Sequence, residues 1–142
     1  MFKIAKTAAA ALMLAASPAL AADKLVTVVI AENPQTQLMS MVLTMQAVGK
    51  GAEAHVLLCG PGGDIALKDA PESATAGQPP KDMSPQGLLK AIIAKGGKAE
   101  VCAIYLPGKG AGPEALIEGV GVAQPPAMAE TMMAEDTVVW SF

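Results

Sequence analysis

Short apolar runs alternate along this chain with segments that begin at a proline and have the character of helices. Strand-like runs occupy residues 24–31, 53–59, 99–106, 119–122 and 136–142. Helices are expected over residues 34–48, 87–95, 113–117 and 126–134. Such a repeat predicts an α/β fold with a mostly parallel sheet of about five strands and with helices on both faces.

The first strand and the first helix are the most clearly marked. Residues 24–31, KLVTVVIA, form a continuous run rich in β-branched residues, which is typical of a parallel strand buried on both faces. Asn33 is a favourable N-cap, Pro34 suits the first helical position, and Gly49 ends the pattern. The apolar face of this helix is expected at Leu38, Met41, Val42, Met45 and Val48. We expect that face to pack against the sheet.

One stretch, residues 60–83, does not follow the strand–helix rhythm. It is rich in glycine and proline and poor in large apolar residues, although residues 65–67 can form one helical turn. Loops of this length inside compact domains are either functional or disordered. Two hypotheses stay open at this point, namely a disordered excursion and a lid over the edge of the sheet.

The N-terminal 21 residues have the layout of a bacterial secretory signal peptide. Two lysines precede an apolar stretch at 8–16, and Ala19 and Ala21 occupy the −3 and −1 positions of a cleavage site. The stretch is too short to span a bilayer. We predict that residues 1–21 are cleaved and that 22–142 form a single periplasmic domain. The alternative is an amphipathic helix belonging to the fold.

The charge of the chain excludes several classes of partner. The sequence has no arginine, and two of its ten lysines precede the predicted cleavage position, whereas all thirteen acidic residues follow it. Eight lysines against thirteen acidic residues leave a net charge of −5 on the predicted mature domain. Nucleic acids and anionic lipid surfaces require a basic patch. We therefore expect no nucleic-acid partner and no membrane association after cleavage.

The order of elements and three sequence matches resemble the DsrE/DsrF-like family of sulfur relay and sulfur oxidation. The matches are Cys102 within AEVCAIYL, the G-x-G loop at 108–110, and the closing strand DTVVWSF at 136–142. The resemblance implies a Rossmann-like three-layer sandwich that assembles into trimers or hexamers. It also implies that Cys102 carries a persulfide and passes sulfur to a partner protein. The family's carriers are cytoplasmic and have a basic helix after this cysteine, where this chain offers only Lys109.

The surroundings of Cys102 fit either a reactive thiol or a buried one. A thiolate is favoured by a nearby cation or by backbone N–H groups. Gly108, Lys109 and Gly110 can supply both, and a helix start is expected at Pro113. Conversely, Cys102 lies four residues before the expected end of its strand, where a small apolar residue fits well. Both interpretations stay open.

Cys59 is the second cysteine, and the loop begins at the residue that follows it. It is a candidate redox companion of Cys102 or a packing residue. A disulfide between the two is the third option, and an oxidising compartment favours it. Its formation requires the strands at 53–59 and 99–106 to be neighbours, which the sequence does not decide.

Other chemistries lack the residues that they need. Methionines on the first and last helices include pairs at i, i+4, which suits core packing better than a Cu(I) site. His55, the single histidine, lies early in its strand, away from the cysteines, so a Ser/His or zinc site is not expected. The glycine loops match no nucleotide-binding motif. We predict neither a metal nor a cofactor.

Two functions follow from these observations. The first is a periplasmic sulfur carrier that uses Cys102 and exchanges sulfur with donor and acceptor proteins. The second is a non-catalytic, oligomeric binding or assembly module in which both cysteines are structural.

Overall fold

A five-stranded parallel sheet organises the protein. The computed structural model describes residues 24–142, so the predicted signal peptide lies outside the described residues. The strands are β1 (Lys24–Val29), β2 (Glu53–Leu58), β3 (Lys98–Val101), β4 (Val120–Val122) and β5 (Thr137–Ser141). Their order across the sheet is β4-β3-β2-β1-β5, and every neighbouring pair is parallel. The predicted α/β class and parallel sheet are therefore confirmed.

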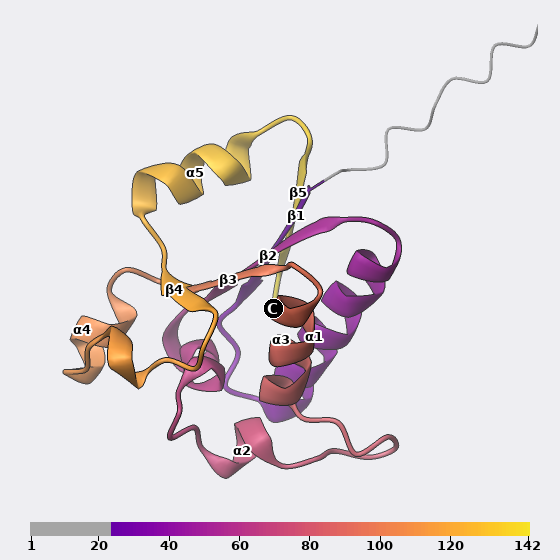
Figure 1. Cartoon of the computed structure of the whole chain (residues 1–142), viewed down its shortest axis with the longest axis vertical. Helices are drawn as coiled ribbons and strands as arrows, with labels where there is room; N and C mark the ends of the chain where they lie inside the picture. Colours follow the sequence, from indigo (N-terminus) through magenta and orange to yellow (C-terminus); the bar gives the residue numbers. More distant parts are fainter. Residues whose placement is uncertain (1–23) are drawn as a thin grey trace, which may run out of the picture.

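Helices cover both faces of this sheet. The α-helices are α1 (Pro34–Gly49), α2 (Glu72–Thr75), α3 (Pro85–Ala94), α4 (Tyr105–Lys109) and α5 (Pro125–Met133). Two 3-10 helices, η1 (Gly60–Ala66) and η2 (Pro113–Ala115), lie between them. Figure 1 shows α1 and α3 side by side on one side of the sheet and α5 on the other. The result is the expected Rossmann-like sandwich.

The hydrophobic core is larger on one face of the sheet than on the other. On the side of α1 and α3, buried residues of β1, β2 and β3 pack with Met41, Leu89 and Ile92. On the side of α5, the buried cluster contains only Val26, Leu57, Ala123 and Met128. The short helix α5 therefore covers a much smaller apolar surface than α1 and α3 do.

The first helix begins as predicted, and its buried face matches the expected one only in part, because Met41 is buried and Met45 and Val48 pack against the core. The Asn33 side chain accepts hydrogen bonds from two backbone N–H groups of the first turn, at 2.9 and 3.1 Å. Leu38 and Val42, expected inside, are only partly buried. The buried stripe is Gln37, Ser40, Met41 and Thr44. Small polar residues fit there because they find partners, as in the 2.8 Å hydrogen bond between the hydroxyls of Thr44 and Thr27 on β1.

The helical methionines divide between core and surface. Met41 and Met128 are buried, and Met45 and Met132 pack against the two clusters, as predicted from their spacing. The remaining two on these helices, Met39 and Met133, are 51% and 83% exposed. Core packing was therefore the right prediction for the i, i+4 pairs and the wrong one for these two.

The third strand is shorter than predicted. The expected strand at 99–106 ends at Val101, and the chain turns so that α4 begins at Tyr105. A hydrogen bond of 2.9 Å from the Tyr105 N–H to the Cys102 carbonyl closes this turn. The helix expected at 113–117 is limited to the single turn of η2. Cys102 consequently follows directly after its strand.

Residues 60–83 contribute to the core. This segment contains η1, α2 and an antiparallel bridge between Gln78 and Met83. Ile65, Ala66 and Ala74 are buried in the larger cluster. The segment is therefore ordered and packed, and the helical turn expected at 65–67 lies at the end of η1.

Gly62 is required by a close approach of η1 to the first strand. A β-carbon at this position would collide with the backbone carbonyl of Val29. We predict that Gly62→Ala lowers the free energy of unfolding by about 1–3 kcal/mol, because backbone cannot move aside as a flexible side chain can. Urea unfolding measures the change. Gly108→Ala on α4 is the control, because nothing lies within 4 Å of its β-carbon. Equal stability of both variants would contradict the prediction.

Candidate functional site

The two cysteines lie next to each other at the carboxyl edge of the sheet. Cys59 follows β2 and Cys102 follows β3, and these strands are neighbours paired in register through Leu58 and Val101. The Cys102 N–H donates to the Leu58 carbonyl at 2.9 Å, which continues the pairing to the cysteines. Their Cα atoms are 5.2 Å apart, and the two residues form a disulfide. The hypothesis that the sequence left undecided is therefore confirmed.

The disulfide lies on the face of the sheet that α5 covers. Both cysteines are partly buried and pack against the cluster of Val26, Leu57, Ala123 and Met128. Its immediate surroundings are therefore apolar. A cysteine in a disulfide does not titrate, so any thiolate chemistry requires the bond to open first.

The residues that were expected to supply charge or backbone N–H groups to Cys102 lie on and just after α4, near the acidic residue Asp64. Gly108 and Lys109 belong to the last turn of α4, and Gly110 caps it in the left-handed conformation with φ 64°. The Lys109 ammonium lies 2.7 Å from the Asp64 carboxylate and 5.6 Å from the centre of the Tyr105 ring. The structure thus pairs the charge of Lys109 with Asp64.

Tyr105 connects α4 to η1 at the same edge. Its hydroxyl donates a hydrogen bond of 2.5 Å to the Asp64 carboxylate. Burial raises the pKa of Tyr105 well above its ordinary value, and the hydrogen bond and charge of Asp64 raise it further. This tyrosine is therefore a permanent hydrogen-bond donor at neutral pH. The carboxylate of Asp64 holds the loops after β2 and β3 together.

A groove of about 570 Å³ lies beside these groups. Gly60 and Ile104, which lie close after Cys59 and Cys102, line it together with Glu32 from the loop after β1. Ile104 is 81% exposed. Sequence reasoning missed Glu32, Asp64 and Tyr105. The signal that could have found Glu32 is its place just after the first predicted strand.

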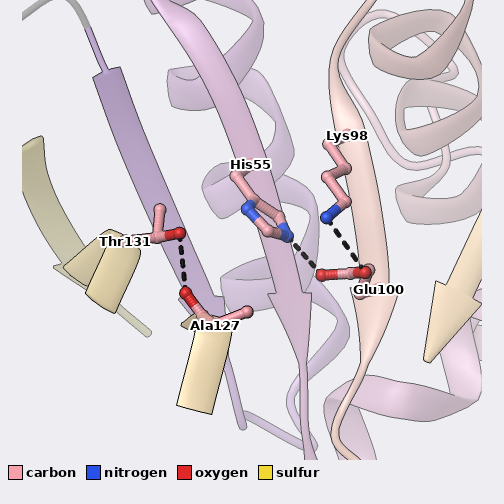
Figure 2. A network of polar contacts seen from close by, with 5 residues as sticks. All are labelled: His55, Lys98, Glu100, Ala127 and Thr131. Atoms are coloured by element: carbon pink, nitrogen blue, oxygen red, sulfur yellow. Dashed lines mark hydrogen bonds and ion pairs between the residues drawn. The ribbon is translucent and has the colours of Figure 1, made fainter. Parts of the chain in front are cut away.

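A second polar network lies on the same face of the sheet, nearer the amino ends of the strands (Figure 2). The Glu100 carboxylate on β3 is 2.7 Å from His55 Nε2 on β2 and 3.1 Å from the Lys98 ammonium. Burial lowers the pKa of His55, and Glu100 opposes that shift. Within residues 24–142, no cluster of three or more histidine, cysteine, aspartate or glutamate residues is arranged to hold a metal ion.

No α-helix within residues 24–142 combines the length and the apolar character that crossing a bilayer demands.

Solved structures of two other proteins have a similar fold. No protein-family model and no curated protein sequence matches this chain. Among solved structures, the ychN protein from E. coli aligns with a TM-score of 0.67 and 18% identity, over 84% of this chain and 99% of its own. MTH1491 from Methanobacterium thermoautotrophicum, a protein of unknown function, aligns with a TM-score of 0.60 and 17% identity, over 84% and 98%. Both have the DsrE/DsrF-like fold. At this identity the likeness concerns the fold alone.

Protonation of His55 is expected to destabilise the folded protein. Its pKa is lowered in the folded state, so the unfolded chain binds the proton more readily. The stability that His55 contributes is therefore fully present above its ordinary pKa of 6.5 and is lost as the pH falls through the lowered folded value. Urea unfolding at several pH values between 7 and 5 should show a steeper loss in the wild type than in His55→Gln. Identical slopes would contradict this assignment.

Proposed function

We propose that this protein is a thiol-based sulfur carrier of sulfur metabolism in which Cys102 holds the transferred sulfur. The observation that carries the proposal is the direct juxtaposition of Cys102 and Cys59 at the carboxyl ends of neighbouring parallel strands. Reactive groups of open α/β sheets gather at this edge. The DsrE/DsrF-like fold of the structural neighbours supports the same assignment.

In the reduced protein, the chemistry uses the two cysteines in turn. The Cys102 thiolate attacks the terminal sulfur of a polysulfide, whose S–S bond breaks, and becomes a persulfide, Cys102–S–SH. An acceptor thiolate then attacks the outer sulfur, takes it away as a new persulfide, and leaves the Cys102 thiolate. Alternatively, the neighbouring Cys59 thiolate attacks the inner sulfur, which forms the disulfide and releases hydrosulfide.

The redox state of the two cysteines supports the proposed compartment. Disulfides persist in oxidising compartments and are rare in the cytosol of mesophiles. A disulfide between Cys59 and Cys102 therefore supports an exported protein. The predicted signal peptide at residues 1–21 leads to the same proposal, a periplasmic domain of residues 22–142 that exchanges sulfur with donor and acceptor partners.

The alternative function is a non-catalytic binding or assembly module in which the disulfide is structural. The observation in its favour is that the disulfide is partly buried in an apolar cluster and links two strands of the sheet. In this case the groove lined by Ile104 and Tyr105 would contact a partner without any chemistry.

Sulfur uptake distinguishes the two functions. Reduced protein incubated with polysulfide should gain about 32 Da per sulfur atom by intact mass spectrometry. Cys102→Ser should gain nothing. Cys59→Ser should keep its adduct longer than the wild type does, because no second thiol removes the sulfur. Unmodified wild-type protein, together with thiols that do not react with a maleimide after reduction in the native state, would favour the structural alternative.

Self-association is a further part of the proposal. Among residues 24–142, the edge strand β5 pairs with β1 alone, and its Val138 and Val139 are 41% and 39% exposed. Apolar side chains on an exposed sheet edge favour burial against another subunit. We expect a homo-oligomer, a trimer or hexamer, in light scattering coupled to size exclusion. A monomer at micromolar concentration would contradict this expectation, and Val139→Lys should shift the oligomer toward smaller species.

A further inference from the structure

We infer that hydrogen sulfide is the substrate that loads this carrier, by opening the Cys59–Cys102 disulfide directly. This inference rests on the proposed function and names its sulfur source. It starts from the fact that both cysteines are already oxidised. A route that begins from a free thiol therefore requires a reductant to open the disulfide first. The disulfide is instead itself the oxidant, because it accepts the two electrons that sulfide loses.

The reaction balances without any other oxidant. The sulfur of hydrosulfide attacks Sγ of Cys102, a new S–S bond forms, and the bond to Cys59 breaks. Cys59 leaves as a thiolate and takes up the proton that H₂S lost when it became hydrosulfide. The products are the persulfide Cys102–S–SH and the thiol of Cys59, so sulfide has been oxidised and the disulfide reduced. The persulfide is the species that the proposed function hands to an acceptor.

Burial of the disulfide selects a small nucleophile. The pair is partly buried against Val26, Leu57, Ala123 and Met128, the last of which comes from α5. A protein thiol would bring a whole side chain and its backbone into this space. Hydrogen sulfide has one heavy atom. The geometry therefore favours sulfide over larger thiols as the group that opens the bond.

The charge around the pair selects a neutral species. The nearest side chain on the same face of β3 is Glu100, and it is already occupied by His55 and Lys98. Lys109, the nearest cation in the following sequence, is paired with Asp64. The apolar cluster against which the two cysteines pack penalises anionic donors such as thiosulfate. Hydrogen sulfide can enter uncharged and lose its proton as it reacts.

After transfer of the sulfur, the protein is left as a dithiol. Cys59 and Cys102 remain within disulfide range, so a two-electron oxidant small enough to reach them restores the disulfide. The protein would then transfer sulfur from sulfide to a thiol acceptor.

The test uses the oxidised full-length protein and sodium sulfide without oxygen. We expect a mass gain of about 34 Da, that of H₂S, and after rapid alkylation a persulfide at Cys102 and a free thiol at Cys59. The rate should exceed those of sulfide with cystine and of glutathione with the protein by at least about tenfold. Neither Cys59→Ser nor Cys102→Ser can form the disulfide, so neither should gain this mass.

The outcomes separate this inference from the proposed function. An oxidised protein that is inert to sulfide, while reduced Cys59→Ser takes up sulfur from polysulfide, overturns the inference and leaves the carrier function. If the oxidised protein is inert to sulfide and reduced Cys59→Ser takes up no sulfur from polysulfide, both the inference and the carrier function are overturned. A persulfide found on Cys59, or glutathione reacting as fast as sulfide, also overturns the inference.

Discussion

The register between β2 and β3 is the constraint on which the site depends. Parallel pairing of Leu58 with Val101 brings the next residue of each strand, Cys59 and Cys102, side by side with their Cα atoms 5.2 Å apart. A shift of one residue would turn the two side chains to opposite faces of the sheet. The same register places His55 and Glu100 on the face that carries the disulfide, where a hydrogen bond between them joins the two strands.

The unequal covering of the sheet gives this pair its chemical character. The larger core under α1 and α3 stabilises the fold. The cysteines lie on the other face, in the smaller cluster under α5, where they are only partly buried. A disulfide in such a place is accessible to a small reagent, yet it is surrounded by apolar groups. This combination connects the fold to the proposed exchange of sulfur.

Several features could be predicted because they depend on local sequence. Continuous apolar runs predicted all five strands, and Asn33 with Pro34 predicted the start of α1. The end of β3 was misplaced by five residues because AIYL is as apolar as a strand. Tyr105 enters a helix since its ring is buried and its hydroxyl reaches Asp64, a residue 41 positions away. No local pattern contains that contact.

The sequence by itself determined the fold class, the parallel sheet and the position of both cysteines after strand-like runs, because these depend on hydrophobic periodicity and on turn-forming residues. Only the tertiary structure decided that β2 and β3 are neighbours, that Cys59 and Cys102 therefore form a disulfide, and that Lys109 is paired with Asp64. The physical reason is that strand order and ion pairing depend on contacts between residues distant in the chain, which the pattern along any one segment does not contain.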